Sequence, residues 1–286
     1  MKNRGPGQIR KGVVAVAGAV FCFSVALTAS GAITFSGSGT DGANNTSLAA
    51  SATFAVDGQG DLVVTLLNNY TGDTRFQADV LTAVFFSGAN GLTPVSATAP
   101  SGSTFWMGKG GSTLTQVTPV PNTTPGPDGT ILGQQWEYLS GISSQAPNGA
   151  SAGISASGLG NIFGSGNFTS SGVMVDGTSY GLVSAGYTGN GNDGLKGGNG
   201  NKTTYFIQDS MTFVLSGFNG NLAGISDVTF QYGTVLSDSS FVGTHLAIAP
   251  EPNYGIAAAV SVGSLLPLGS LKLWCRRCRV KRGFGG

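Results

Sequence analysis

The alternation of hydrophobic and polar positions is clearest in the segment ATFAVDGQGDLVVTLLNN, residues 52–69. Two apolar runs, Ala52–Val56 and Leu62–Leu67, flank the loop sequence DGQGD. Short runs rich in β-branched side chains, joined by a Gly-rich loop, are typical of a β-hairpin. The segment therefore predicts two antiparallel strands connected by residues 57–61.

Further short runs follow along the chain with period-two alternation or continuous apolar character, both of which indicate strands. They are Val80–Phe86, Gln134–Leu139, Ser179–Ala185, Ser210–Ser216 and Ser226–Gly233. In the last two, one face would carry alternate apolar side chains: Met211, Phe213 and Leu215, then Val228, Phe230 and Tyr232. Residues 142–168 fit neither a strand nor a helix, because they are rich in Gly and Ser.

This pattern predicts an all-β body, an antiparallel β-sandwich that is jelly-roll-like, with about eight to twelve strands and long Gly/Ser-rich loops. The composition agrees, since 286 residues include 48 glycines but only 14 basic and 13 acidic side chains. Such a chain is poor in helix formers, which disfavours a helix bundle. The segment from Ile33 to Ala249 has no cysteine, so its stability must come from a hydrophobic core.

The first 32 residues have the layout of a secretory signal peptide, with a basic lead, an apolar run and small residues at the end. Ser30 and Ala32 occupy the small-residue positions that predict cleavage after Ala32. Export would then require the Sec machinery and signal peptidase. The alternative is a permanent N-terminal membrane anchor.

The other end of the chain carries a second apolar segment. Nineteen residues without a charge, Asn253–Leu271, would extend about 28 Å as a helix, close to the thickness of a bilayer core. A basic stop signal follows and would stay in the cytoplasm by the positive-inside rule. It consists of Arg276, Arg277, Arg279, Lys281 and Arg282. A buried core helix is the alternative interpretation of the apolar segment.

Charge is segregated between these ends and the body. The body carries four basic residues against twelve acidic ones, a net charge of −8 from Ile33 to Ala249. An acidic body repels nucleic acid, so nucleic acid is excluded as a partner. The basic ends, beside apolar runs, indicate membrane topology instead.

The sequence Pro250-Glu251-Pro252, followed by a short apolar span and an arginine-rich end, resembles the PEP-CTERM sorting signal of Gram-negative envelope and biofilm proteins. The resemblance covers residues 249–286. It implies that an exosortase, a membrane-embedded cysteine protease, removes the tail near the motif. The precursor would be held in the inner membrane by its C-terminal helix, and the mature protein would reach the cell surface or be secreted. Asn253 and Tyr254 depart from the small residues that often follow the motif.

Glu251 is the only charge between Asp238 and Lys272, and its two neighbouring prolines keep the backbone extended. An accessible, singly charged junction of this kind suits recognition by a protease. A rigid linker before an anchor would have the same conformation without cleavage.

Several sequence segments of the body, from Asp61 to Thr234, also resemble a family of exosortase-dependent surface proteins. They are DLVVTLLNN, DVLTAVFFSGANGLTPVSA, GQQWEYLSGIS, SGLGNIFGSGNF, YGLVSAGYTGNGNDGLKG and SDVTFQYGT. The family is defined by sorting and sequence. The resemblance therefore implies a surface protein and carries over no catalytic residue.

Residues suited to catalysis are few. His245 is the only histidine and lies four residues before Ala249, so any hydrolase would have to use it as its base. Seven of the twelve body carboxylates adjoin glycine, a position where Asp usually caps a turn. Glu137, the one body glutamate, alternates with Trp136 and Tyr138. We expect no enzymatic activity and no histidine zinc site.

Other patterns support no cofactor. The loop GNGNDGLKGGNGNK, residues 189–202, has G-x-G-x-x-G spacing outside a strand-to-helix context and suggests calcium only as an alternative to a flexible loop. The pair Cys275 and Cys278 lies in the tail. Six aromatic residues are expected mostly in the core, with a glycan-binding face as the alternative: Trp106, Trp136, Tyr138, Tyr180, Tyr187 and Tyr232.

The sequence thus divides into a signal peptide (1–32), a β-sandwich surface domain (33–248) and a sorting signal (249–286). It predicts an exported structural protein of the cell surface or extracellular matrix, associated with biofilm or exopolysaccharide. The alternatives are an extracellular carbohydrate-binding module and, third, a secreted hydrolase.

Overall fold

The computed structural model describes residues 31–117, 132–169, 172–189, 194–198 and 202–246. The sorting motif, the basic stop signal and the predicted signal peptide up to residue 30 lie outside these residues. The described chain is all-β, with fifteen strands and four short 3₁₀ helices. No helix among the described residues is long and apolar enough to cross a membrane.

The strands form two sheets. The six-stranded sheet has the order β15-β1-β2-β3-β12-β5. Its strands are β1 (Ile33–Thr40), β2 (Ser47–Val56), β3 (Leu62–Leu67), β5 (Thr93–Thr98), β12 (Ser210–Ser216) and β15 (Thr244–Leu246). All its pairs are antiparallel, which confirms the hairpin predicted around residues 57–61.

The nine-stranded sheet follows β14-β13-β4-β10-β11-β6-β7, and β9 also pairs with β4 and β8. Its strands are β4 (Leu81–Ser87), β6 (Phe105–Lys109), β7 (Thr115–Val117), β8 (Glu137–Ser140), β9 (Ala152–Ser155), β10 (Leu182–Val183), β11 (Thr203–Gln208), β13 (Ser226–Tyr232) and β14 (Ser240–Val242). The pair β10–β11 is parallel. The sheet is therefore mixed, and the expectation of antiparallel pairing throughout was wrong here.

The 3₁₀ helices lie in the connections. They are η1 (Gln77–Asp79), η2 (Leu132–Gln134), η3 (Pro147–Gly149) and η4 (Leu222–Gly224). The predicted strand 134–139 is thus partly wrong, since η2 takes its first residue. The predicted strand 179–185 shrinks to two residues, because Tyr180 adopts a φ of 62° in a turn.

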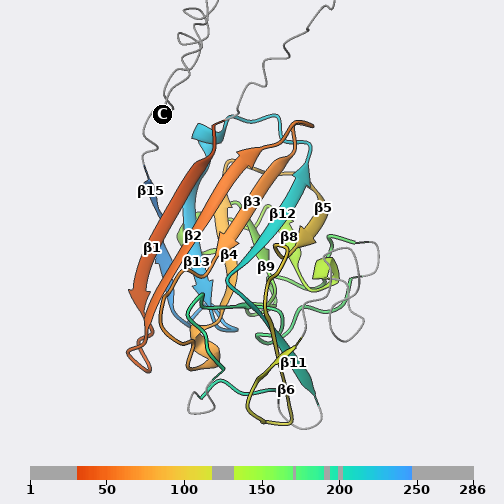
Figure 1. The fold of residues 1–286 in the computed structure, drawn as a ribbon. Helices are drawn as coiled ribbons and strands as arrows, with labels where there is room; N and C mark the ends of the chain where they lie inside the picture. The colour runs from red at the N-terminus through yellow and green to blue at the C-terminus, as the bar shows by residue number, and fades with distance from the viewer. Residues whose placement is uncertain (1–30, 118–131, 170–171, 190–193, 199–201, 247–286) are drawn as a thin grey trace, which may run out of the picture.

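The main core lies between the two sheets (Figure 1), with β1, β2, β3 and β12 in front of β4 and β13. Alternate residues of β12 supply Met211, Phe213 and Leu215, as the sequence pattern predicts. The rings of Phe54 on β2 and Phe86 on β4 meet edge to face at 5.2 Å, which joins the two sheets. Burial of such large apolar side chains is the main source of stability in a cysteine-free domain.

A second cluster covers the opposite face of β4. Ala83 and Phe85 point into it and meet Ile142, Leu159 and Phe163. β4 is therefore buried on both faces, which explains its continuous apolar run. The Gly-rich segment 142–168 supplies this cover and includes β9.

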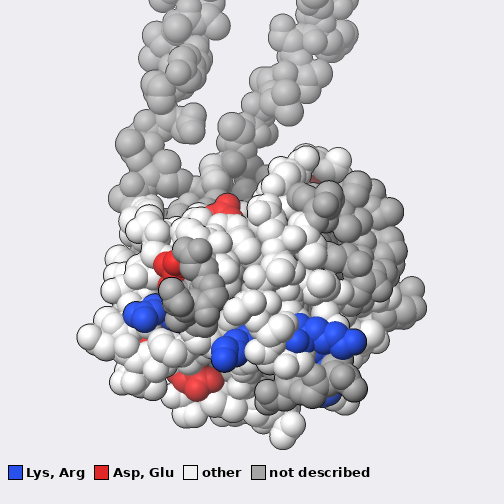
Figure 2. All heavy atoms as spheres, turned by 60° about the horizontal axis from the view of Figure 1, so that its bottom comes forward, with Lys and Arg blue, Asp and Glu red and all other residues white. Residues whose placement is uncertain are grey.

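Both ends of the described body lie at the top of Figure 1, because Thr34 pairs with Leu246 across β1 and β15. All the described Lys and Arg side chains are Arg75, Lys109, Lys196 and Lys202, and all four are exposed. Figure 2, in which the bottom of Figure 1 comes forward, shows them spread along this one face. We call these four residues the basic end.

Candidate functional sites

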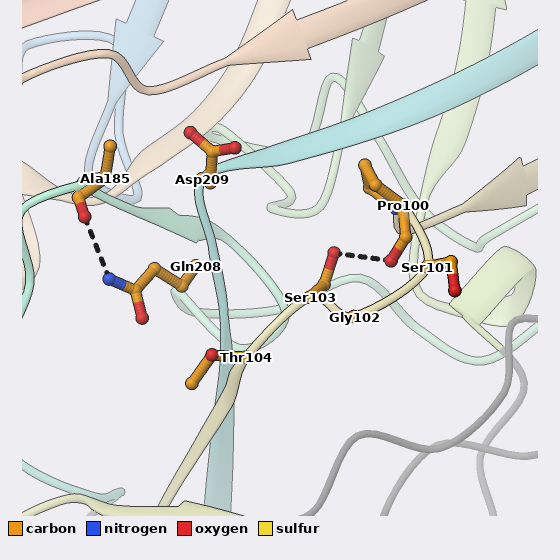
Figure 3. A pocket seen from close by; sticks show the side chains of 8 residues that line it. All are labelled: Pro100, Ser101, Gly102, Ser103, Thr104, Ala185, Gln208 and Asp209. Carbon is orange, nitrogen blue, oxygen red and sulfur yellow. Dashed lines mark hydrogen bonds between the residues drawn. The ribbon is translucent and has the colours of Figure 1, made fainter. Parts of the chain in front are cut away.

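A polar pocket of about 440 Å³ opens where β6 and β11 meet the turn after β5 (Figure 3). One wall is the turn Pro100–Thr104, and the other is formed by Ala185, Gln208 and Asp209. The turn closes locally because Ser103 donates from its amide and its hydroxyl to the Pro100 carbonyl, at 3.1 and 2.7 Å. The pocket was not anticipated from the sequence, because its walls come from segments about a hundred residues apart.

Gln208 holds this region together. Its amide nitrogen donates to the carbonyls of Ala185 and Tyr187 at 3.0 and 2.9 Å, while its oxygen accepts from the Trp106 indole at 3.0 Å. Trp106 in turn packs edge to face on Tyr187 at 4.9 Å. Both polar ends of Gln208 are thus occupied within the protein, so its side chain is structural.

Asp209 marks the corner at which the chain leaves β11 in one sheet and enters β12 in the other. Its φ of 82° lies in the left-handed region, which Asp tolerates better than most residues. The corner is fixed because Asp209 donates its amide to the Val183 carbonyl at 3.1 Å and accepts from the Asn68 amide at 2.9 Å. Its exposed carboxylate and the hydroxyls of Ser101 and Thr104 suit binding of a hydroxylated ligand.

The lining of this pocket contains one carboxylate, whereas acid and base catalysis on a glycoside needs two. Glu137 does not supply the second, because it lies on β8 and accepts hydrogen bonds from the backbone amides of Gly164 and Ser165. Burial raises the pKa of Glu137, and these two amides lower it only in part. The lining of the pocket therefore does not provide the carboxylate pair of a glycosidase.

His245 lies on the edge strand β15, with its ring 5.3 Å from that of Phe35. It lines a separate cavity of about 400 Å³ together with Ser226 and Asp227. The Ser226 hydroxyl donates to the Asp227 carboxylate at 3.0 Å. A hydrolytic triad instead needs the serine hydroxyl on the histidine and the carboxylate behind it. These three residues are thus close together but are not arranged as a triad.

A third group of polar residues is buried, and we call it the buried carboxylate cluster: Asp41, Thr46, Asp79 and Tyr232. Asp79 Oδ2 accepts from the amides of Arg75 and Phe76 at 3.1 and 3.0 Å. Asp79 Oδ1, Thr46 Oγ1 and Tyr232 Oη have no hydrogen bond of normal geometry. Nothing in the sequence pattern indicated that these residues would meet.

Burial governs protonation in this cluster. It raises the pKa of Asp79, against the two backbone amides that lower it. Burial also raises the pKa of Tyr232 well above its ordinary value, and the nearby Asp79 charge adds to this effect. For Asp41, burial again raises the pKa, but hydrogen bonds from Ala43, Asn44 and Ser239 together leave it lowered. Burial thus disfavours the charged forms of both Asp79 and Tyr232.

Six aromatic residues were expected mostly in the core, with a glycan-binding face as the alternative. All six lie in the core. Their exposed fractions are at most 8 %: Trp106, Trp136, Tyr138, Tyr180, Tyr187 and Tyr232. Trp136, for example, packs on Phe213 with ring centroids 4.9 Å apart. The prediction that most of them are buried is confirmed.

Most of the residues predicted to take part in sorting or in metal binding lie outside the described residues. Among the predicted sorting residues only Ala32 is described, and it directly precedes β1. Pro250, Glu251 and Pro252, the tail cysteines and Asp193 of the Gly-rich loop lie outside the described residues. Where the chain is described, no three His, Cys, Asp or Glu side chains gather into a metal site. Calcium binding by the loop stays a prediction.

Comparison with protein-family models, with curated proteins and with solved structures finds no match for this chain.

Proposed function

We propose that this chain is the precursor of an exported, non-enzymatic protein of a Gram-negative envelope or extracellular matrix. Sec export and signal peptidase would remove residues 1–32, and an exosortase would cut near Pro250-Glu251-Pro252. The mature protein is a structural component of the cell surface or of a biofilm matrix. Its body is a jelly-roll-like β-sandwich.

One observation carries the proposal: every strand that the structure describes lies between the two predicted junctions. β1 begins at Ile33, the residue after the predicted signal cleavage, and β15 ends at Leu246, four residues before Pro250. Both terminal segments could therefore be removed without taking a strand from either sheet.

The arrangement of the two ends supports the same proposal. Ile33 pairs with Phe54 on β2, and Thr34 pairs with Leu246 on β15, so both ends of the body leave from one side. An anchor at either end would hold the body in the same orientation to a membrane. Its stability rests on buried aromatic and aliphatic side chains, which suits a domain exported without disulfides.

Intact mass of the surface-associated protein tests the proposal. We expect a mature form that starts at Ile33 and ends near the Pro-Glu-Pro motif. Glu251→Ala should leave a longer, membrane-bound form, because the charge that marks the junction is lost. Asp176→Asn changes an exposed body carboxylate and serves as the matched control, with normal processing expected. A mature protein that still ends at Gly286 would refute exosortase processing.

A further inference from the structure

The basic end gathers cations that are far apart in the sequence onto one exposed surface. Arg75, Lys109, Lys196 and Lys202 come from four separate segments, and Figure 2 shows them along one face. Red carboxylate atoms also appear on this face, in part beside the blue ones. In a body with a net charge of −8, such a concentration of positive charge requires an explanation.

The ladder between β6 and β11 brings two of these cations together. Lys109 pairs with Thr203, the residue after Lys202, and the Gly110 amide donates to the Lys202 carbonyl at 3.4 Å. Both lysines are therefore fixed at the same end of this strand pair. The polar pocket lies at its other end, five residues along β11 or about 17 Å away.

Lys196 is held in place by its neighbours. Leu195 is buried in a third apolar cluster with Trp106 and Phe206, which directs the adjacent Lys196 outward. The Gly197 amide donates to the Ser112 carbonyl at 3.0 Å. A Cβ at Gly197 would lie 2.1 Å from the Gly108 carbonyl carbon, so the two backbones touch directly. The lysine is thus mounted on a packed segment.

The same segment reaches Arg75. A Cβ at Gly194 would lie 2.7 Å from the Phe76 ring and 3.1 Å from the Arg75 carbonyl. Residues 194–198 therefore run from Arg75 to the end of the β6–β11 ladder, and they connect all four cations into one surface.

Carboxylates near this surface are already engaged. Asp79 accepts from the Arg75 and Phe76 amides, and Asp73 accepts from the amide and hydroxyl of Thr188. These carboxylates accept from backbone amides and a local hydroxyl, and the hydrogen bonds cited for them do not involve the side chains of the four cations.

Recognition of a sugar by stacking has little platform in the described part of the chain, where every Trp and Tyr side chain is buried except Tyr70, which is half-buried. The same fact disfavours single-stranded nucleic acid, whose bases stack on aromatic side chains. The acidic remainder of the body disfavours the densely charged double helix. Separated cations instead match a polymer whose carboxylates are spaced along a flexible chain.

We propose that the basic end binds an acidic polysaccharide through its carboxylate groups. This inference rests on the proposed function, since an exported protein meets such a polymer outside the cell. The surface lies opposite Ile33 and Leu246, so it would face away from a membrane to which either end is attached.

Binding of the full chain, purified in neutral detergent, to alginate at low and physiological salt tests this inference. The variant with Arg75, Lys109, Lys196 and Lys202 all replaced by Gln should bind on the order of tenfold to a hundredfold more weakly. Wild-type affinity should fall as salt rises, because screening shortens electrostatic range. Single-stranded DNA and neutral dextran are the comparison ligands.

The matched control keeps the charges, with the three lysines changed to Arg and Arg75 to Lys, and should bind alginate as the wild type does. All variants share the same basic termini, so a difference in alginate affinity between them is due to the basic end. Unchanged binding by the Gln variant, equal binding of dextran, or a Gln variant that loses more affinity for DNA than for alginate would overturn the inference. Thermal unfolding shows whether the variants are folded. Intact mass measures whether the terminal segments have been removed, so a failure of processing can be distinguished from a failure of binding.

Discussion

The buried carboxylate cluster and the basic end come within four residues of each other in the chain, at Asp79 and Arg75. The first buries its ionisable side chains, whereas the second exposes them. Asp79 is 2 % exposed and its side chain serves backbone amides, whereas the cations of the basic end are exposed. A carboxylate turned inward stabilises the loop that carries it. A cation turned outward contributes little to stability and is free to contact a partner.

Removing the inward carboxylate should have the largest effect. Asp79→Ala leaves the amides of Arg75 and Phe76 without their acceptor, so we expect the free energy of unfolding to fall by about 2–4 kcal/mol. Arg75→Gln, from the outward set, should change it by less than about 0.5 kcal/mol. Urea denaturation measures both variants. Equal losses would mean that the two regions do not differ in this way.

The support beneath the basic end comes next. Gly197→Ala places a methyl group 2.1 Å from backbone that cannot move aside, so we expect a loss of about 1–3 kcal/mol and weaker alginate binding. Gly224→Ala is the control, since no atom lies within 4 Å of its added Cβ. Denaturation and the binding assay report the two effects. A stable Gly197→Ala variant would show that the segment adapts freely.

The smallest effect concerns pH. Because burial raises the folded-state pKa of Asp79 above 3.8, its ordinary value, its contribution favours the fold below pH 3.8 and is lost as pH rises through the folded pKa. Asp79→Asn removes this titration while keeping an acceptor for the amides. Its stability relative to wild type should therefore increase with pH, by about 1.4 kcal/mol for each tenfold change in proton affinity. Urea denaturation between pH 3 and pH 8 measures the difference, and a constant difference would contradict the assignment.

Much of the six-stranded sheet could be predicted because apolar and polar side chains alternate along several of its strands. β2, β3 and β12 bury every second residue on one face. β1 was missed, since Gly37 and Gly39 interrupt the pattern. Both lie against the Phe241 ring, which a Cβ would approach to 2.8 or 2.9 Å. Phe241 of β14 therefore supplies the apolar group that β1 lacks at these two positions.

The nine-stranded sheet was harder to predict for a related reason. β9 lies in the Gly-rich segment without an assigned strand, and a Cβ at Gly153 would lie 2.8 Å from the Phe85 ring. Such strands are specified by what covers them rather than by their own side chains. This explains why about eight to twelve strands were expected and fifteen are described.

The candidate sites depend still more on long-range contacts. Seven Asp residues beside glycine suggested turn caps. Asp57 is one, since it accepts from the Gln59 and Asp61 amides at 2.9 Å, whereas Asp73 accepts from the distant Thr188. By contrast, the basic end and the buried carboxylate cluster join residues from distant segments. Their sequence neighbours carry no shared pattern, so only the fold brings them together.

The pairing of β15 with β1 has a mechanical consequence. β15 runs antiparallel to β1 and ends beside its start, at the side from which both chain ends leave. A pull on Leu246 away from the body would act along the strand axis and load the β1–β15 hydrogen bonds together, in shear. A body tethered there and gripped at its opposite end would be stretched along its strands, the direction in which a sheet resists force best.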